Sequence, residues 1–282
     1  MAFLPMRRRL GPTVEVQAGI AHFGVISRGD RCSGRSDEQK GAGMQTDDTR
    51  EAWGVLHLEA TEQAFLAGRR KKQADVESAV AVFLEFLRGF ELLQVPDPCV
   101  SVFGSARIGP DQPYYQMARA LGRKLAEAGF AVMTGGGTGL MEAANRGARE
   151  GGGFSMGCSI ALPAEQRRNE FLDSFVHFDH FFVRKVMLVK YSRAFVVMPG
   201  GFGTVDEAFE IATLIQTGKL TRFPIVAMGV AFWEPVRQLL RETMVPQGLI
   251  DEVDLQLVKL TDDVQEAVDW IQTGIKPLAE YP

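Results

Sequence analysis

The stretch Pro199-Gly-Gly-Phe-Gly-Thr-Val-Asp-Glu207 decides the fold, because it joins two regular segments of different period. The apolar run 194–198 precedes it, and a short β-rich run bounded by Pro and Gly predicts a buried strand. The segment 205–216 follows with helical periodicity. Glycine lets the backbone approach a bound group, and the free N–H groups of a helix start favour an anion. The motif therefore predicts an anion site, although a tight turn without a ligand also uses glycine.

A second stretch, Thr134-Gly-Gly-Gly-Thr-Gly-Leu-Met141, has the same layout. The apolar run 130–133 predicts a strand before it, and the segment 141–150 predicts a helix after it. We call residues 134–139 the first glycine turn and residues 199–204 the second. Two such turns in one parallel sheet predict a single phosphate-like ligand, held by backbone N–H groups from 136–139 and 201–204.

Residues 96–282 alternate between short apolar runs and amphipathic segments. Repeated strand–helix units predict an α/β fold with a doubly wound, mostly parallel sheet and helices on both faces. The expected strands are 99–103, 130–133, 155–162, 175–178, 194–198, 224–228 and 257–260. The expected helices are 113–128, 141–150, 181–192, 205–216, 232–244 and 262–272.

The chain before residue 96 has a different pattern. Residues 1–45 lack sustained periodicity and are expected to form a disordered N-terminal extension. Residues 46–95 are expected to form a helical segment that packs on the following domain. Its clearest part is the helix predicted over 73–93, which we expect to cover an edge or a face of the sheet. The apolar residues that predict this helix recur at steps of three and four: Val76, Val80, Phe83, Leu84, Leu87 and Phe90.

The composition of the 282-residue chain is typical of a globular protein, with 46% hydrophobic and 23% charged residues. Its formal net charge of −4 gives no electrostatic case for nucleic acid or an anionic membrane as a partner. No apolar run approaches the roughly 20 residues that span a bilayer. The three cysteines, Cys32, Cys99 and Cys158, are odd in number and widely spaced, which favours a reducing, cytoplasmic location. Cys99 and Cys158 fall in predicted strands, where buried thiols are expected. No Cys/His spacing predicts a metal site.

In a parallel sheet the loops that follow the strands lie at one edge, and ligands bind where the strand order changes direction. The loop Gly104-Ser105-Ala106-Arg107 and the two glycine turns are therefore alternative positions for the site. No Walker A motif places a lysine for a triphosphate. The first glycine turn also lacks the third glycine of a dinucleotide fingerprint, and the next strand lacks its ribose-binding acid.

Charged residues near this edge have two interpretations each. Arg184 and Lys185 fall in the first turn of their predicted helix, where the helix dipole disfavours cations by roughly 0.3–1 kcal/mol. A functional position for Arg184 is favoured over exposure to water, because its helix begins at the same edge as the glycine turns. Thr204-Val-Asp-Glu207 fits a capping box, so the local pattern alone makes Glu207 a cap. Glu210 lies one turn further on the same face, so both carboxylates are candidates to line the site.

Three motifs together resemble the LOG ("Lonely Guy") proteins, which are cytokinin riboside 5′-monophosphate phosphoribohydrolases. The motifs are Gly135-Gly-Gly-x-Gly-Leu-Met141, Arg184-Lys185 and Pro199-Gly-Gly-x-Gly-Thr-x-x-Glu207. The resemblance covers about residues 96–272. It implies a Rossmann-like domain, usually a homodimer or a higher assembly of dimers, that binds a nucleoside 5′-monophosphate and uses no metal or redox cofactor. Such enzymes cleave the N-glycosidic bond and release free base and ribose 5-phosphate.

By this resemblance, Arg184 and Glu207 match the two catalytic positions of the family. Ala161 departs from the family pattern, which often has an acidic residue there, and this leaves the preferred base open. The residues expected to bind the substrate are Gly104, Ser105, Gly135, Gly136, Gly137, Thr138, Gly139, Met141, Glu165, Lys185, Gly200, Gly201, Phe202, Gly203, Thr204 and Glu210.

The resemblance agrees with the chemistry of these residues. A 5′-phosphate suits the glycine turns, and a ribose offers hydroxyls to Glu207 and Glu210. A carboxylate stabilises the oxocarbenium-like state of N-glycoside cleavage, while Arg184 is expected to hold the phosphate and keep the carboxylate ionised. The predicted function is hydrolysis of AMP or N6-modified adenosine monophosphates. The alternatives are a non-catalytic nucleotide or molybdenum-cofactor carrier on the same fold, and an amino-acid decarboxylase, for which no Schiff-base lysine can be singled out.

Overall fold

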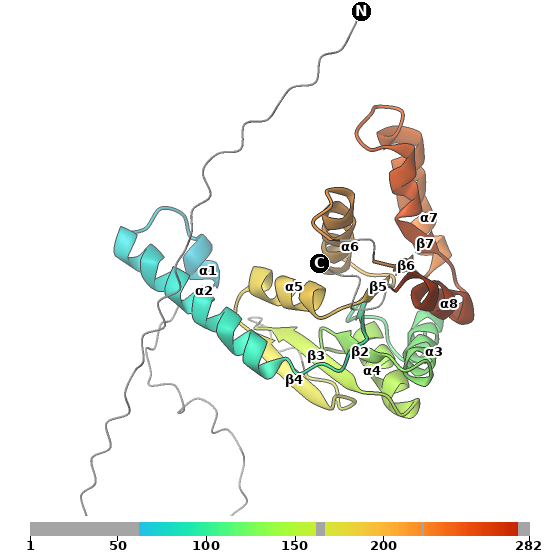
Figure 1. Ribbon diagram of the computed structural model, residues 1–282, viewed down its shortest axis with the longest axis horizontal. Helices are drawn as coiled ribbons and strands as arrows, with labels where there is room; N and C mark the ends of the chain where they lie inside the picture. The colour runs from blue at the N-terminus through green and yellow to red at the C-terminus, as the bar shows by residue number, and fades with distance from the viewer. Residues whose placement is uncertain (1–61, 162–166, 221–222, 276–282) are drawn as a thin grey trace, which may run out of the picture. The chain divides into compact units, whose positions relative to one another are not determined.

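The computed structural model describes residues 62–161, 167–220 and 223–275, and all described elements belong to one folded unit. Seven strands form a sheet in the order β4-β3-β2-β1-β5-β6-β7, and every neighbouring pair is parallel (Figure 1). The doubly wound parallel sheet predicted from the sequence is confirmed. The strands are β1 (Cys99–Phe103), β2 (Ala131–Thr134), β3 (Ser155–Ile160), β4 (Ser174–Phe178), β5 (Ala194–Val197), β6 (Ile225–Ala227) and β7 (Val258–Leu260).

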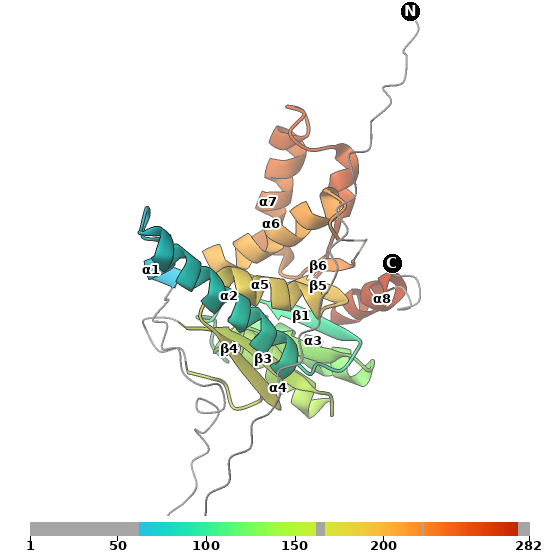
Figure 2. The same cartoon turned by 60° about the vertical axis from the view of Figure 1, so that its left-hand side comes forward.

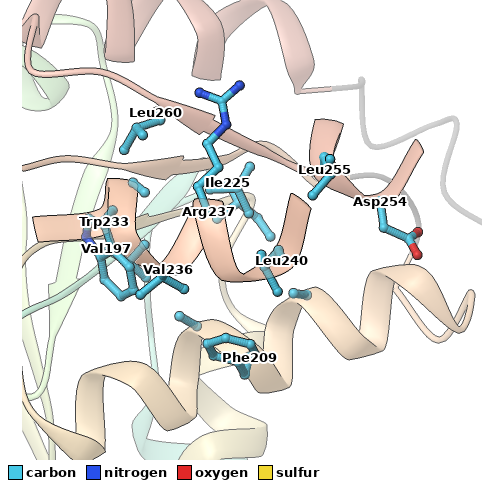
Figure 3. Close-up of a pocket in the computed structure, with 14 residues that line it drawn as sticks. Val197, Phe209, Ile225, Trp233, Val236, Arg237, Leu240, Asp254, Leu255 and Leu260 are labelled. Carbon is cyan, nitrogen blue, oxygen red and sulfur yellow. The ribbon is translucent and has the colours of Figure 1, made fainter. Parts of the chain in front are cut away.

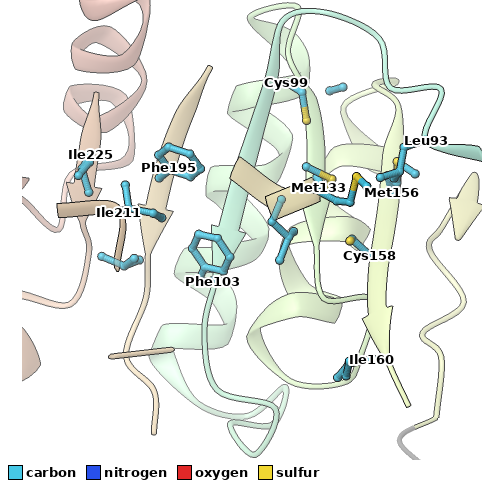
Figure 4. Close-up of a cluster of buried hydrophobic side chains, with 14 of the residues drawn as sticks. Leu93, Cys99, Phe103, Met133, Met156, Cys158, Ile160, Phe195, Ile211 and Ile225 are labelled. Atoms are coloured by element: carbon cyan, nitrogen blue, oxygen red, sulfur yellow. The ribbon is translucent and has the colours of Figure 1, made fainter. Parts of the chain in front are cut away.

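Helices cover both faces of the sheet, because alternate strand residues point to opposite sides. Cys99 and Phe103 of β1 belong to the cluster drawn in Figure 4, whereas Val100 and Val102 belong to a second cluster on the other face. Helices α5 (Phe181–Lys190), α6 (Phe202–Gln216) and α7 (Val230–Leu239) pack on the first cluster. Helices α3 (Pro113–Glu127), α4 (Leu140–Glu150) and α8 (Val264–Gly274) pack on the second.

The strand order changes direction between β1 and β5. From β1 the chain proceeds outward through β2, β3 and β4, and it then returns to the other side of β1 to form β5, β6 and β7. The first glycine turn follows β2 and the second follows β5, so the loop after β1 lies between them at the carboxyl edge. This is the position at which parallel α/β sheets bind ligands.

Helix α2 (Lys72–Leu92) follows the short α1 (Glu62–Leu66) and lies beside α5 and β4, as Figure 2 also shows. Its buried residues are Ser78, Glu85 and Gly89, and a Cβ at Gly89 would lie 2.6 Å from Cε of Met187. The expectation that this helix covers an edge of the sheet is confirmed, because it contacts the edge strand β4. The apolar residues whose spacing predicted the helix are nevertheless all between 42% and 60% exposed: Val76, Val80, Phe83, Leu84, Leu87 and Phe90. Val82 and Phe86 pack against the core cluster instead.

The bounds of some elements differ from the pattern-based expectations. Helix α6 begins at Phe202, three residues earlier than expected, and α7 gives way after Leu239 to a π-helical turn, η1 (Leu240–Met244). A 3-10 helix, η2 (Glu252–Gln256), precedes β7 and was not expected. The predicted disordered extension, residues 1–45, lies outside the described residues.

Candidate active site

The loop after β1 is hydrogen-bonded to both glycine turns. The N–H of Ser105 donates to the carbonyl of Pro199 at 3.0 Å, and the carbonyl of Ser105 accepts from the N–H of Leu140 at 2.9 Å. The hydroxyl of Thr138 donates to the carbonyl of Ala106, also at 2.9 Å. The three loops that the sequence left as alternatives therefore form one site.

Gly139 is required for the close approach of these loops. Its φ is +69°, a conformation that side chains other than glycine rarely adopt. A Cβ there would lie 2.4 Å from the carbonyl oxygen of Ser105 and 2.6 Å from the carbonyl carbon of Ala106. The backbone of the first glycine turn thus touches the backbone of the β1 loop.

A network of buried polar side chains holds the first glycine turn in place. The N–H of Gly136 donates to Oγ1 of Thr134 at 2.9 Å, and that hydroxyl donates to Oδ1 of Asn145 at 2.6 Å. Nδ2 of Asn169 donates to the carbonyl of Gly137 at 2.9 Å and to Oδ1 of Asn145 at 3.1 Å. The sequence-based reasoning missed both asparagines. The signal for Asn145 was a polar residue on the small, apolar face of its helix.

Backbone donors remain free at both helix starts. In the part of the chain that the structure describes, the N–H groups of 137–139 and of 201–203 have no protein acceptor. Two of the donors expected to face a phosphate are used internally. The N–H of Gly136 binds Thr134, and the N–H of Thr204 donates to the carbonyl of Gly201 at 3.0 Å. Fewer backbone N–H groups are therefore available to an anion than the sequence suggested.

The start of α6 rules out the capping box at Thr204 and Glu207. Gly201 is the N-cap residue and makes no side-chain cap, so Thr204 already lies within the first helical turn. Its side chain folds back against Gly200, where a Cβ would lie 2.1 Å from Oγ1 of Thr204. The interpretation of Glu207 as a cap is wrong, because the helix begins at Phe202 and Glu207 therefore lies beyond its first turn.

Glu207 is a buried carboxylate with an incomplete set of partners. The residue is 4% exposed, and its Oε1 lies 3.5 Å from Nη1 of Arg184. Its buried Oε2 has no hydrogen-bond partner among the described residues. Burial raises the pKa of Glu207 to about 7, against the lowering effect of the positive charges of Arg184 and Lys185. We expected Arg184 to keep this carboxylate ionised, but burial raises its pKa by more than Arg184 lowers it.

Arg184 is held at the junction of three elements. Its Nε donates to the carbonyl of Cys158 on β3 at 2.9 Å, and its side chain is only 12% exposed. A Cβ at Gly135 would lie 2.9 Å from its Nη2 and 2.8 Å from Sδ of Met141. The first glycine turn thus makes room for the guanidinium, and the alternative that Arg184 simply points to water is wrong.

Lys185 and Glu210 bind each other at the edge of this pair. Nζ of Lys185 lies 2.7 Å from Oε2 of Glu210 and 2.7 Å from Oδ2 of Asp206. Glu210 and Glu207 do lie on the same side of α6, as the spacing predicted. Glu210 has a close cation in this state, whereas Glu207 has only the longer contact with Arg184.

Two carboxylates from the N-terminal helices satisfy the start of α5. Oε1 of Glu85 accepts from the N–H groups of Asp179 at 2.6 Å and of His180 at 3.1 Å, and its Oε2 pairs with Nδ1 of His180. Oε1 of Glu62 accepts from the N–H of Phe181 at 3.1 Å. The negative charges of Glu62 and Glu85 offset the unfavourable placement of Arg184 and Lys185 near the N-terminus of α5. Glu85 was missed because its partners lie almost a hundred residues away.

The remaining residues that the sequence analysis singled out include two expected substrate contacts and two cysteines. Phe202, at the start of α6, is 96% exposed, whereas Glu165 lies outside the described residues. Cys99 and Cys158 are free and buried, as expected. Burial raises the pKa of the Cys158 thiol to about 12, so this sulfur beside Arg184 is not a thiolate at neutral pH.

A separate apolar pocket lies on the other side of α6, between α6, α7 and the strands β6 and β7 (Figure 3). Phe209, Trp233, Val236 and Leu240 are among its lining residues, and neither Arg184 nor any residue of the glycine turns is. The described residues contain no cluster of three or more His, Cys, Asp or Glu side chains that could hold a metal ion. Among the described helices, none is both long and apolar enough to cross a membrane.

The chain is similar to several known proteins. The family model described as "Possible lysine decarboxylase" matches residues 141–271. An uncharacterized protein of Archaeoglobus fulgidus is 32% identical over 127 residues, which are 44% of this chain and 81% of that protein. A cytokinin riboside 5′-monophosphate phosphoribohydrolase of Rhodococcoides fascians is 26% identical over 179 residues, which are 62% of this chain and 89% of that enzyme. A molybdenum cofactor carrier protein of Chlamydomonas reinhardtii superposes with a TM-score of 0.46 and 23% identity, over 63% of this chain and 98% of that structure.

Proposed function

The chain belongs to the LOG family, and on that premise we propose that it hydrolyses the N-glycosidic bond of AMP or of N6-modified adenosine 5′-monophosphates. The products are the free base and ribose 5-phosphate. Relatives named as phosphoribohydrolases support a hydrolase acting on a small nucleotide. The identity of the preferred base is our proposal.

The observation that carries this proposal is the state of Glu207. A carboxylate that is 4% exposed, with one oxygen lacking a hydrogen bond, is costly to keep in a fold. A structural role does not account for it, because the helix cap is made by Gly201. A pKa of about 7 suits a group that must be an anion for part of a reaction and must also accept a proton.

We assign the phosphate to the free N–H groups of the two helix starts, 137–139 and 201–203. Arg184 borders this space from the side of Gly135, and its guanidinium can bind a phosphate oxygen while its Nη1 stays beside Glu207. Lys185 and Glu210 can exchange their mutual contact for the ribose hydroxyls.

The reaction breaks the bond between C1′ of the ribose and the nitrogen of the base. Ionised Glu207 stabilises the positive charge that develops on the ribose as this bond lengthens. The oxygen of a water molecule then bonds to C1′, and one of its protons moves to Glu207. The electron pair of the broken bond leaves with the base, whose nitrogen takes a proton from solvent. Glu207 then returns to solvent the proton that it took from water, so protons and charge balance.

The experiment that tests this function measures base release from matched substrates. The protein is incubated with AMP, isopentenyl-AMP, and adenosine as the control that lacks the phosphate. We expect free base from the monophosphates and little from adenosine, because the glycine turns recognise the phosphate. Release from adenosine at the same efficiency would contradict the phosphate site, and no release from any monophosphate would contradict the hydrolase.

The competing function is a non-catalytic carrier of a nucleotide or of the molybdenum cofactor. Binding of a monophosphate without release of base would favour that function. Glu207 and Arg184 favour the enzyme, since a carrier does not need a buried carboxylate whose pKa lies near neutrality. We further propose a cytoplasmic location, which the free thiols of Cys99 and Cys158 support, and an assembly of at least two chains.

A further inference from the structure

Asn169 contacts the first glycine turn with both its main chain and its side chain. Its N–H donates to the carbonyl of Gly136 at 3.0 Å, and its Nδ2 donates to the carbonyl of Gly137 at 2.9 Å. The residue is only 4% exposed, so both bonds lie in an environment of low dielectric constant, where hydrogen bonds are stronger than in water. One buried residue thus holds two consecutive carbonyl groups of the turn to which we assign the phosphate.

The planar, trans peptide group converts these contacts into a direction for the next N–H. In such a group the carbonyl of one residue and the N–H of the following residue point in opposite directions. The carbonyl of Gly136 therefore sets the direction of the N–H of Gly137, and the carbonyl of Gly137 sets that of Thr138. Because both carbonyls point toward buried Asn169, both N–H groups point away from it. Neither N–H has an acceptor among the described residues.

The amide of Asn169 is itself held in one orientation. Its Oδ1 accepts from the N–H of Phe171 at 3.0 Å, and its Nδ2 also donates to Oδ1 of Asn145 at 3.1 Å. The Nδ2 of Asn145 in turn lies 2.8 Å from Oγ of Ser155 and 3.3 Å from the carbonyl oxygen of Met156. Both side-chain amides have acceptors for their two N–H groups, so a rotation of either would break buried hydrogen bonds.

We propose that Asn169 is a positioning residue for the phosphate: its side chain orients the N–H of Thr138, and its main chain orients that of Gly137. This role rests on the phosphate site of the proposed function and names the residue that orients part of its donors. Donors that are oriented before the anion arrives need no reorganisation when it binds, which favours affinity. A purely structural role would not require that the N–H groups next to both bonded carbonyls be left free.

The two contacts of Asn169 should respond differently to substitution. Asn169→Ala removes Nδ2 but keeps the main-chain N–H that binds Gly136. The peptide group between Gly137 and Thr138 then loses its hydrogen bond to residue 169, whereas the peptide group between Gly136 and Gly137 retains it. The N–H of Thr138 should therefore lose its fixed direction, while the N–H of Gly137 keeps it.

Amide NMR of the full chain during titration with inorganic phosphate tests this difference without any hydrolysis. In the parent, the signals of Gly137 and Thr138 should shift on binding, whereas that of Gly136, whose N–H has an internal acceptor, should shift less. In Asn169→Ala the shift of Thr138 should be reduced and that of Gly137 retained. Calorimetry should show an affinity for AMP that is lowered about tenfold. Asn169→Ser, whose side chain is one bond shorter, should give the same pattern and replaces the alanine variant if that variant does not fold.

Ser192→Ala is the matched control for the loss of buried hydrogen bonds. Oγ of Ser192 lies 2.7 Å from Oγ of Ser101 and 2.7 Å from the carbonyl oxygen of Leu188, and none of these residues belongs to a glycine turn. This variant should lose stability but bind AMP like the parent. An equal loss of AMP affinity in Ser192→Ala would overturn the role of Asn169, because any lost buried bond would then have the same effect.

The same titration separates the role of Asn169 from the phosphate site itself. If phosphate shifts neither Gly137 nor Thr138 in the parent, the phosphate lies elsewhere, and the role of Asn169 is overturned together with that site. If the parent shows both shifts and Asn169→Ala shows them undiminished with parental affinity for AMP, only the role of Asn169 is overturned. Release of base from AMP does not enter either outcome, so a protein that binds the nucleotide without cleaving it gives an equally clear result.

Discussion

The protonation of Glu207 depends on two opposing effects at one carboxyl group. Burial disfavours the anion and raises its pKa to about 7, while the nearby charge of Arg184 partly offsets this rise. The result is a group that ionises near neutral pH. In the proposed reaction the ionised form is the active one, because only a carboxylate stabilises an oxocarbenium-like ribose and takes a proton from water.

The pH dependence of kcat/KM follows from this balance. We expect the rate to rise as pH increases through about 7 and then to level off, as Glu207 becomes ionised. In Arg184→Ala the rise should move to higher pH, because the positive charge that lowers the pKa of Glu207 is gone. The measurement is a pH–rate profile of both proteins, with Arg237→Ala as a control for loss of a distant arginine. An unshifted profile in Arg184→Ala would mean that Glu207 is not the titrating group.

At the scale of elements, the glycines of the two turns are of two kinds: the fold requires some of them and does not require others. Gly139 is needed by the fold, since its φ is positive and a Cβ would strike the β1 loop. Gly201 and Gly203 have neither constraint, because a Cβ at either position meets no atom within 4 Å. We propose that glycine at those two positions serves the close approach of a bound group.

This difference predicts opposite effects on stability and binding. Gly203→Ala should leave the free energy of unfolding unchanged or raise it by up to about 1 kcal/mol, because alanine favours a helix more than glycine does. Gly201→Val should fold but lose AMP binding, since its side chain would occupy the space over the free N–H groups. Denaturant unfolding and calorimetric titration with AMP measure the two effects. Binding of AMP to Gly201→Val with the parental affinity would place the phosphate elsewhere.

Helix α2 holds the position of α5, the helix that carries Arg184. Glu85→Ala would leave the N–H groups of Asp179 and His180 without an acceptor. We expect the free energy of unfolding to fall by about 2–4 kcal/mol. We also expect KM for AMP to rise, because the start of α5 is no longer fixed. Arg88→Ala, an exposed change on the same helix, should do neither. Parental stability and KM in Glu85→Ala would contradict this role.

The sequence predicted strands, helices and sheet direction well, because these depend on local periodicity. It also placed Arg184 and Glu207 at one edge. It misjudged features that depend on distant partners. The capping box at Glu207 looked convincing until Gly201 proved to start the helix, and nothing local could reveal that Glu85 meets the start of α5. The spacing of the apolar residues predicted helix α2 correctly, but their outward direction depends on which face of the helix approaches the domain.

At the scale of the whole molecule, the N-terminal region divides into two parts with different expected roles. Removing residues 1–43 should leave stability and activity essentially unchanged, because that part of the sequence lacks the periodicity of a packed element. Removing residues 1–95 deletes Glu62 and Glu85 and should strongly reduce both. Thermal unfolding and base release from AMP compare the two truncations. Unfolding of the shorter truncation, or full activity of the longer one, would contradict this division.

The central claim is that Glu207 performs chemistry. The replacement Glu207→Gln preserves the shape of the side chain and removes its charge. Because burial raises the pKa of Glu207 from 4.5 to about 7, the folded state holds the proton more tightly than the unfolded state. The parent therefore loses stability as pH rises through that window. Glutamine escapes this loss, so at pH 8 the variant should be at least as stable as the parent, by up to roughly 3 kcal/mol.

The most direct measurement is the turnover of AMP and isopentenyl-AMP by Glu207→Gln, set beside its affinity for the same nucleotides. We predict that release of free base falls by about 10²–10⁴-fold, while nucleotide affinity and folding are retained. Such a separation of rate from binding and stability is what a group acting on the reacting ribose should show. Release of base by Glu207→Gln at the parental rate would contradict the account.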